Sequence, residues 1–324
     1  MKYGSIPDVE KPVSRIGQGS VVFGGEGKGE QDYRLLDAAL AAGITLFDSA
    51  HMYGGGRCDK ALGQWVRDRG VREKIVLMDK GCHHDRSGNR VTPDHITEDL
   101  HTCLRNTGFD YLDVFAFHRD DPAVPVGPLM ERLNQHIREG KVRALGASNW
   151  THQRIAEANA YAAERGLTGF AVSSPHYSLG QCIDDPWGGT AVTITGEAGK
   201  FARAWYEANR MALVPWSALC GGLFSGRFRR DNMQAFTAGG DLRTVRCYCC
   251  EFNFRRLDRA AEIGREKKAS VAQIALAWML NGPLNCFPLT AGATEQEIRD
   301  NAAAAEIALT AEEVAWLDLR SDTR

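Results

Sequence analysis

Short apolar segments alternate with longer amphipathic ones along most of this chain, and that alternation limits the folds open to it. Strands are expected at the short apolar segments, residues 16–23, 44–49, 74–80, 111–118, 142–149, 169–174, 212–217 and 284–290. Helices are expected at the amphipathic segments, residues 32–42, 60–69, 92–107, 126–139, 151–165, 199–209, 254–267, 270–281 and 295–305. Eight strand–helix repeats without a linker predict an α/β fold, a single-domain (β/α)8 TIM barrel over residues 1–324.

The alternative arrangement is a doubly wound open sheet, which binds a dinucleotide through a glycine-rich turn after its first strand. Residues 23–30 contain glycines at that place, but not in the G-x-G-x-x-G order that such a turn requires. One further segment, residues 222–251, is rich in glycine and arginine and fits no strand–helix repeat. It is predicted to be a long loop over the rim of the barrel.

Charge and hydropathy narrow the range of partners. The net charge of −2 does not indicate a nucleic acid or an anionic membrane as a partner. No apolar stretch approaches the length of about 20 residues that crosses a bilayer, and residues 1–20 lack the apolar centre of a secretion signal. We therefore expect a cytoplasmic protein that acts on a small molecule, while the sequence leaves its state as a monomer or homo-oligomer open.

The chain has nine cysteines, an odd number spread through a sequence long enough to form its own core. A disulfide framework is therefore not expected. Cys247, Cys249 and Cys250 form one close group, but a metal or redox site there would need a second close group of cysteines. These residues are expected to be reduced cysteines of a loop, without a metal.

Polar side chains stand at the carboxyl ends of several predicted strands. Asp48 ends the first of these apolar segments, Lys80 the next and His118 the third. Later strands end on Ser148, Asn149, Ser173, Ser174, Ser217 and Thr290. In a (β/α)8 barrel the carboxyl ends of all strands lie on one rim, where catalytic sites are built. Residues distant in the sequence are thus expected to converge on one site.

Asp48, Tyr53, Lys80 and His118 form a chemically coherent set. A free tyrosine has a pKa of about 10, too high for proton exchange near neutral pH. A lysine ammonium about 4 Å away favours the phenolate by roughly 4 kcal/mol at an effective dielectric of about 20, or about 3 pKa units. Asp48 would hold the lysine charged, and His118 would orient a bound carbonyl. Together these groups can pass a proton to a carbonyl oxygen while a hydride reaches its carbon.

The motifs around these residues resemble those of the aldo-keto reductase family. They are D-S-A-x-x-Y-G-G-G at 48–56, the lysine that closes IVLMDK, the histidine that closes DVFAFH, and GASNW at 146–150. They occur in the order typical of the family, and the resemblance extends from about Val13 to Asn301. It implies that Tyr53 is the general acid and base, that Lys80 lowers its pKa, that Asp48 pairs with Lys80, and that His118 orients the substrate carbonyl.

The resemblance also implies a nicotinamide cofactor that lies extended across the rim without a Rossmann domain. Ser148 and Asn149 would hold its carboxamide. The backbone near the pyrophosphate would come from WSALCGG, at Ser217, Leu219 and Gly221, where small residues allow close approach.

Three positions bear on how the cofactor is held. Ser174 stands where the family often has a glutamine that helps hold the carboxamide. Asn301 matches an asparagine that contacts the adenine, while Glu297 stands where the family often has a residue that contacts the 2′-phosphate. A carboxylate is unfavourable beside a phosphate and favourable beside a ribose hydroxyl. NADP(H), the cofactor of most of the family, is favoured, and NAD(H) stays open.

The expected reaction is the reduction of an aldehyde or ketone in a small, polar, sugar-like molecule to an alcohol. Four polar or aromatic residues beside the catalytic set in sequence are expected to contact the substrate: His51, His83, Arg119 and Trp150.

Two alternatives belong to other functional classes. In a metal-dependent barrel hydrolase, rim histidines would gather around zinc: His51, His83, His84 and His118. Such a site leaves Tyr53 and Lys80 without a role. In a non-catalytic sensor, the same scaffold would bind a nicotinamide cofactor and report its redox state to a partner. The intact set of four catalytic residues argues against this second alternative.

Overall fold

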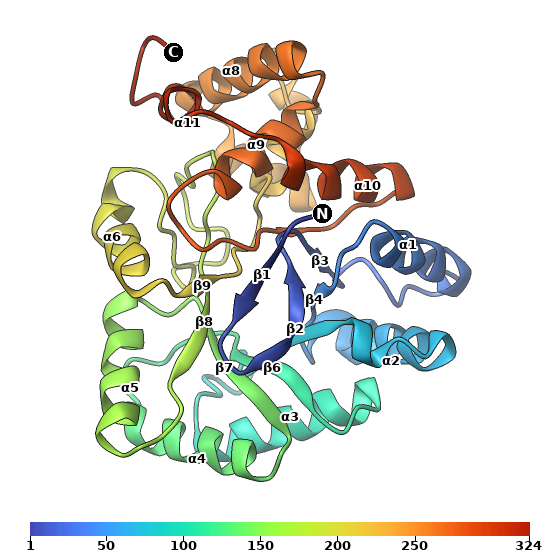
Figure 1. Ribbon diagram of the computed structural model, residues 1–324, viewed down its shortest axis with the longest axis vertical. Helices are drawn as coiled ribbons and strands as arrows, with labels where there is room; N and C mark the ends of the chain where they lie inside the picture. Colours follow the sequence, from blue (N-terminus) through green and yellow to red (C-terminus); the bar gives the residue numbers. More distant parts are fainter.

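The computed structural model describes all 324 residues and shows eight parallel strands that curl into a barrel inside a ring of helices (Figure 1). The strands pair in the order β10-β3-β4-β5-β6-β7-β8-β9. Their bounds are β3 (Gly17–Gly19), β4 (Leu46–Asp48), β5 (Val76–Gly81), β6 (Leu112–Phe117), β7 (Val142–Ser148), β8 (Phe170–Ser174), β9 (Ala212–Leu213) and β10 (Leu289–Thr290). The predicted (β/α)8 barrel is confirmed.

Hydrogen bonds just before β10 close the barrel. The Leu213 N–H donates to the Asn285 carbonyl at 2.9 Å, and the Phe287 N–H donates to the Leu213 carbonyl at 2.7 Å. The two shortest strands of the sheet, β9 and β10, are thus joined by the extended segment that leads into β10. Closure leaves the sheet without an unpaired edge.

Helices cover the outside of the barrel at the predicted places. They are α1 (Gly29–Ala41), α2 (Arg57–Arg69), α3 (Pro93–Thr107), α4 (Val126–Arg138), α5 (His152–Glu164), α6 (Lys200–Asn209), α8 (Glu251–Lys267), α9 (Val271–Leu280) and α10 (Glu295–Ala303). Local chemistry explains several starts: the Thr92 side chain accepts from the His95 N–H before α3, and Ser270 forms a reciprocal capping box with Gln273 at α9.

An amino-terminal hairpin that the periodicity does not predict covers the amino end of the barrel. It consists of β1 (Tyr3–Ile6) and β2 (Val9–Ser14), and it crosses the barrel opening nearest the viewer in Figure 1. Ile6, Val9 and Val13 belong to the same buried cluster as the side chains inside the barrel, such as Val76 and Val114. The hairpin therefore completes the inner core.

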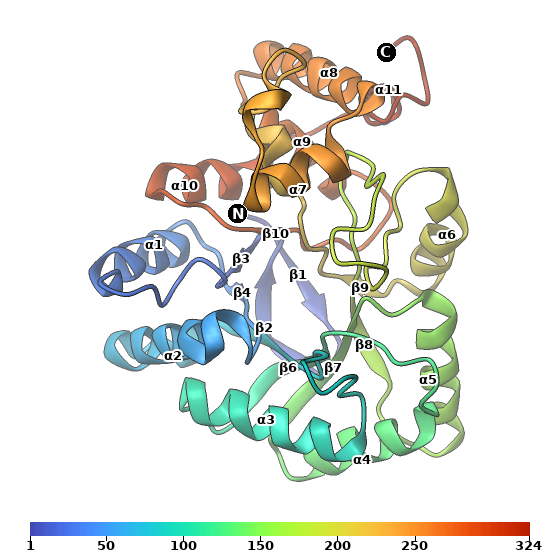
Figure 2. The same cartoon turned by 180° about the vertical axis from the view of Figure 1, so that it is seen from behind.

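The segment predicted as a loop, residues 222–251, contains a helix. This helix, α7 (Gly239–Tyr248), lies on the far side of the molecule from the hairpin (Figure 2). Its first two residues are glycines and its apolar residues are few, so local propensity is low. Tertiary contacts hold it instead, since the Thr244 hydroxyl donates to the Gly221 carbonyl at 2.9 Å and Cys247 is buried. A short helix near the carboxyl terminus, α11 (Ala311–Leu317), was also not predicted.

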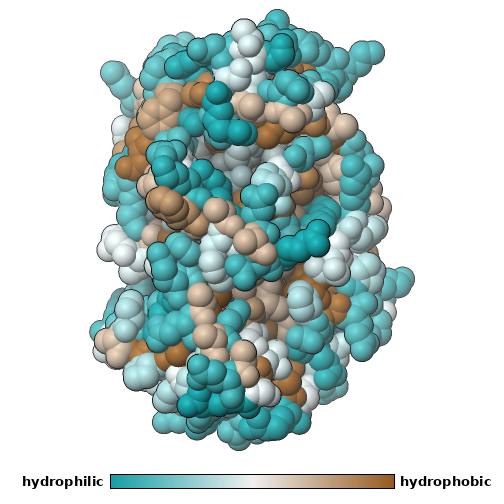
Figure 3. Space-filling model, turned by 60° about the vertical axis from the view of Figure 1, so that its left-hand side comes forward, coloured by the Kyte–Doolittle hydropathy of each residue, from teal (hydrophilic) through white to brown (hydrophobic).

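Hydrophilic side chains cover most of the face shown in Figure 3, and hydrophobic ones appear there in small separate groups. None of the helices has the length and apolar character that crossing a bilayer requires.

Candidate active site

The carboxyl ends of the strands surround a cavity of about 1080 Å³. This volume slightly exceeds the usual range for small-molecule pockets, about 300–1000 Å³, and suits an extended ligand. The cavity brings together most of the residues proposed from the sequence: Asp48, Tyr53, Lys80, His83, His118, Arg119, Ser148, Asn149, Ser217, Leu219, Gly221, Glu297 and Asn301.

A buried ion pair lies at the base of this cavity. Strands β4 and β5 are parallel neighbours, so their carboxyl ends bring Lys80 Nζ to 2.5 Å from Asp48 Oδ1 and 2.6 Å from the Ser49 carbonyl oxygen. Burial alone would lower the pKa of Lys80, but the negative charge of Asp48 and the nearby Tyr53 side chain raise it above its ordinary value. The ammonium therefore stays charged across the neutral range.

Tyr53 stands over this pair at the start of the turn η1 (Tyr53–Gly56). Gly54 and Gly55 have φ angles of 57° and 67°, a conformation that glycine adopts without strain and that turns the chain back into α2. Lys80 Nζ lies 5.1 Å from the centroid of the Tyr53 ring. Burial raises the pKa of Tyr53, and the charge of Lys80 opposes that rise without cancelling it. Lys80 therefore lowers the pKa of Tyr53, as expected from the sequence. Burial raises this pKa by more, so the phenol stays protonated.

His118 follows β6 and faces Tyr53 across the cavity. The two ring centroids are 5.6 Å apart in an edge-to-face arrangement, and the His83 ring lies 4.7 Å from that of His118. Burial, together with the charges of Lys80 and Arg119, holds the pKa of His118 well below its usual range. Burial also lowers the pKa of His83, to about 4. Both imidazoles are therefore neutral near pH 7.

Asn149 follows β7 with a φ of 59°, and its side-chain amide links several parts of the rim. Its Nδ2 donates to the His118 carbonyl at 3.3 Å and to the Ser148 hydroxyl at 3.0 Å. Its Oδ1 accepts from the Trp216 indole N–H and from the Val192 backbone N–H, each at 3.2 Å. The position predicted to hold a carboxamide is thus firmly placed.

The far end of the cavity lies against α7 and α10. A Cβ on Gly221, which has a φ of 61°, would lie 2.5 Å from Thr244 Oγ1, so only glycine lets these segments meet. The carboxylate of Glu297 is engaged by the backbone just before its own helix, because Oε2 accepts from the Ala293 N–H at 2.7 Å. Asn301 is nearly buried and lines the cavity.

Three of the predicted site residues are not brought to the cavity. His51 is turned aside, with Nδ1 3.0 Å from the Lys80 carbonyl oxygen and Nε2 3.7 Å from Asp99 Oδ1. Trp150 is 1% exposed, packs on Phe117, and donates its indole N–H to the Arg119 carbonyl at 3.1 Å. These two residues support the site from behind and do not line it.

Ser174 is the third such residue. It is 1% exposed, its hydroxyl oxygen is buried without a hydrogen-bond partner, and it does not line the cavity. Its carbonyl oxygen contributes instead, since it accepts from the Ser148 hydroxyl at 2.9 Å. The side chain predicted to replace the family's glutamine is therefore not available at the cavity surface.

Other lining residues were missed by sequence reasoning. They include Met52, Trp187, Trp216, Arg243, Ser270 and Asp300. A signal existed for Trp216, which directly precedes Ser217 at the end of a predicted strand. None existed for Trp187, which reaches the site because the segment 186–196 pairs with His176: the His176 N–H donates to the Val192 carbonyl at 2.8 Å.

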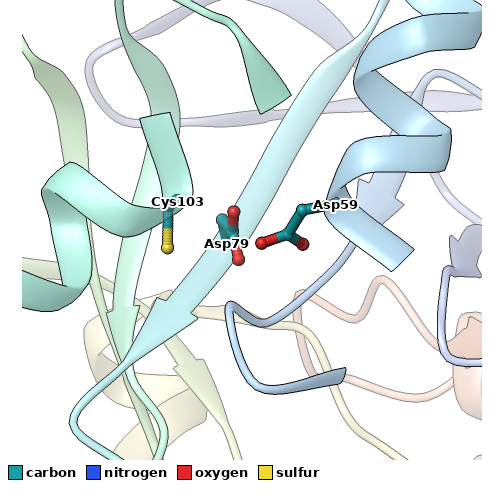
Figure 4. A group of neighbouring side chains, drawn as sticks. All are labelled: Asp59, Asp79 and Cys103. Atoms are coloured by element: carbon teal, nitrogen blue, oxygen red, sulfur yellow. The ribbon is translucent and has the colours of Figure 1, made fainter. Parts of the chain in front are cut away.

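The four histidines proposed as zinc ligands do not gather into a metal-binding group. Asp59, Asp79 and Cys103 do lie close together, with one ligand atom of each within 4.8 Å of the others (Figure 4). They are buried outside the barrel wall, between β5 and the helices α2 and α3, and none of them lines the cavity. One carboxylate oxygen of each aspartate has no hydrogen-bond partner.

The sequence signature of the Aldo/keto reductase family matches residues 15–319, nearly the whole chain. The chain belongs to the aldo/keto reductase family. This reductase is an oxidoreductase that acts on carbonyl or alcohol groups.

Individual relatives and solved structures match this chain over most of their lengths. An aldo-keto reductase from Strobilurus tenacellus is 29% identical over 317 residues, which cover 94% of this chain and 87% of that protein. A probable voltage-gated potassium channel subunit beta from Oryza sativa subsp. japonica is 27% identical over 314 residues, covering 95% and 92%. An aldo-keto reductase from Klebsiella pneumoniae, solved with NADPH, superimposes with a TM-score of 0.71 at 22% identity and covers 100% of this chain and 97% of that one.

Proposed function

We propose that this reductase converts an aldehyde or ketone to the alcohol, with Tyr53 as the proton donor. The observation that carries the proposal is the charged Lys80–Asp48 pair buried beneath a protonated Tyr53, with neutral His118 facing the same cavity. When bound, the reduced nicotinamide supplies the hydride to the carbonyl carbon. Tyr53 holds the proton that passes to the carbonyl oxygen, and solvent returns a proton to Tyr53 afterwards.

The other three residues act on this proton transfer. Lys80 favours the phenolate that forms when Tyr53 gives up its proton, because its charge lowers the pKa of Tyr53 while burial raises it. Asp48 keeps that ammonium charged and in place. His118, held neutral, offers a hydrogen bond that orients the carbonyl oxygen without competing as an acid.

The cavity suits a nicotinamide dinucleotide at both ends. Ser148 and Asn149 would hold the carboxamide beside the catalytic residues, and Ser217, Leu219 and Gly221 would lie along the pyrophosphate. A Cβ at Gly221 would collide with Thr244, so this backbone stretch keeps the close approach that a diphosphate needs. Asn301 would face the adenine.

Charge at the adenine end favours NADP(H) over NAD(H). Arg243 of α7 lines the cavity there, is exposed, and forms no ion pair within the chain. The arginines 227, 229, 230 and 299 are instead paired with acids: Asp241, Asp231, Glu251 with Asp258, and Glu295. A guanidinium with free donors is a natural partner for a phosphate. The negative charge of Glu297, by contrast, would disfavour the phosphate. Its carboxylate already accepts a hydrogen bond from the Ala293 N–H, just before α10.

Two matched variants test the cofactor choice. Arg243→Gln is expected to raise the KM for NADPH about tenfold with little change for NADH, since one charged hydrogen bond contributes about 1.5–3 kcal/mol. Glu297→Gln is expected to shift the preference further toward NADPH. If the ratio of the KM for NADPH to the KM for NADH is the same in Arg243→Gln as in the unmodified protein, Arg243 does not contact the 2′-phosphate.

The reaction itself is tested by Tyr53→Phe. Removing the hydroxyl should lower kcat by a factor of about 10²–10⁴ for every carbonyl substrate, with NADPH binding retained in a fluorescence titration. Unchanged turnover in this variant would refute the role of Tyr53. Tight NADPH binding by the unmodified protein, without turnover of any carbonyl compound, would instead favour the non-catalytic sensor.

A further inference from the structure

Arg119 is a buried cation in the wall of the cavity, directly after His118. It is 6% exposed. One nitrogen, Nη1, donates to the His118 carbonyl at 2.9 Å, while Nε is buried without any partner. A neighbouring arginine in the same part of the fold, Arg154, shows the usual arrangement, since its Nε lies 3.4 Å from a carboxylate oxygen of Asp120.

Arg119 forms no ion pair with a carboxylate of the chain. The carboxylate of Asp185 acts on the pKa of Arg119, and its oxygens accept backbone N–H groups of Trp187 at 2.6 Å and Ala191 at 2.9 Å. Burial lowers the pKa of Arg119, with Tyr53 and Asp185 opposing. A desolvated charge without an ion-pair partner is unfavourable in the folded protein, so a buried guanidinium at this place calls for an explanation beyond stability.

Trp187 gives the guanidinium a defined orientation. The central carbon of Arg119 lies 4.6 Å from the Trp187 ring centroid, and the Trp187 ring in turn lies 4.3 Å from that of Trp216. Stacking on an aromatic face leaves the in-plane donors of a guanidinium available for a planar, two-oxygen acceptor. In Arg119 these are Nη2 and the second hydrogen of Nη1, since the first donates to the His118 carbonyl and Nε is buried. Sugar hydroxyls do not match that geometry, whereas a carboxylate does.

We propose that Arg119 binds a carboxylate of the substrate, so that the preferred substrates are short oxo acids, in which an aldehyde or ketone stands near a carboxylate. The proposal rests on the function proposed above and replaces the sugar-like substrate expected from the sequence. The short distance between the carboxylate and the carbonyl of such a substrate follows from the position of Arg119, which directly follows His118 and lines the same cavity as Tyr53. The anion and the carbonyl must therefore be bound side by side.

The test compares each acid with its neutral methyl ester under saturating NADPH. Glyoxylate, pyruvate and succinate semialdehyde form three such pairs. The carbonyl adjoins the carboxylate in the first two acids, as an aldehyde and as a ketone, and two methylene groups separate the groups in the third. We expect kcat/KM to favour the acid by about tenfold or more in at least one pair, because hydrogen bonds between two charged groups are stronger than those to a neutral ester. In Arg119→Gln that preference should fall to about one, and Arg119→Lys should retain part of it.

Arg229→Gln is the matched control, because it removes the same charge from an exposed residue outside the cavity and should keep the acid-to-ester ratio. The inference is overturned if the unmodified protein reduces acids and esters equally in all three pairs, or if Arg119→Gln keeps the preference. Absence of turnover on all six compounds and on simple aldehydes would instead count against the proposed function.

A second measurement applies if Arg119→Gln fails to fold. Butanoate, but not butanamide, should then inhibit the unmodified protein competitively, and equal inhibition by both compounds overturns the inference.

Discussion

At the scale of single residues, the site depends on charges that the surrounding fold has removed from water. Lys80 and Asp48 illustrate this, because both side chains are almost fully buried and each has the other as its only counter-ion. A buried pair of this kind adds little net stability, but breaking it by removing one partner leaves an uncompensated charge. The role of the pair is therefore to keep a charged ammonium beside Tyr53, and its contribution to stability is secondary.

Substituting Lys80 by methionine tests this view. Lys80→Met should lower the free energy of unfolding by about 3–5 kcal/mol, because the Asp48 carboxylate would remain buried alone. The double variant Asp48→Asn/Lys80→Met should recover much of that loss while remaining inactive. Urea denaturation measures both. A loss below about 1 kcal/mol for the single variant, the value of an exposed pair, would contradict the prediction.

Asp59 and Asp79 form a buried pair of acidic side chains, which couples the stability of the protein to pH (Figure 4). Burial, reinforced by the charge of Asp59, holds the pKa of Asp79 well above its usual range. The native state therefore keeps a proton that the unfolded chain releases above about pH 4. Because the native state binds more protons, this pair lowers the stability progressively as the pH rises toward the folded pKa.

Asp79→Asn should remove that penalty. Asparagine can keep the 2.8 Å hydrogen bond from the Lys80 N–H through its carbonyl oxygen, and it cannot ionise. Relative to the unmodified protein, the variant should gain stability as the pH increases from about 5 to about 8. Denaturation midpoints at several pH values measure this, with Asp110→Asn as the exposed control. A difference that stays constant with pH would rule out a native-state proton on the pair.

At the scale of elements, close backbone contacts decide how the helices meet. In α2, Gly63 faces the carboxyl end of α3, and a Cβ on it would lie 2.0 Å from the Thr107 carbonyl oxygen. Helix propensity alone would favour alanine at this position by about 1 kcal/mol. The contact reverses that preference, because a backbone oxygen cannot move aside without displacing the helix.

Gly63→Ala is therefore expected to destabilise the protein by about 1–3 kcal/mol or more, through overpacking. Gly240→Ala in α7 is the matched control, since the nearest atom to its added Cβ would be 3.6 Å away. It should leave stability unchanged or raise it by up to about 1 kcal/mol. Chemical denaturation of both variants measures the difference, and similar effects from the two substitutions would show that packing against Thr107 is unimportant.

At the scale of the whole molecule, the cavity joins distant parts of the chain. Its walls come from the end of β4, from the segment after β9 and from α10, so an extended ligand contacts both halves of the barrel. Any ligand that binds only the native state raises stability by mass action. A cofactor held across the rim should therefore stabilise the entire fold and not one local segment.

NADPH at about 100 times its Kd should raise the free energy of unfolding by about 2.7 kcal/mol. Tyr53→Phe should show the same gain, because it removes chemistry and not cofactor contacts. Arg243→Gln should show a smaller gain at the same concentration of NADPH. Thermal or urea denaturation with and without the cofactor measures all three. A gain in Arg243→Gln equal to that of the unmodified protein would contradict the placement of the phosphate.

The order of the barrel strands, the helices that alternate with them and the chemistry at the strand ends follow from the sequence by itself, whereas the hairpin β1–β2 and the helices α7 and α11 do not. Apolar periodicity is a local property, and the parallel barrel it specifies brings Asp48, Lys80 and His118 to one rim. Only the tertiary structure decides which side chains reach the cavity. Trp150 packs into the core, while Trp187 of the segment 186–196 lines the cavity. The direction in which each side chain points depends on contacts between segments that are distant in the sequence. Burial likewise sets the pKa of Tyr53 and leaves Arg119 unpaired, and the degree of burial exists only once the chain has folded.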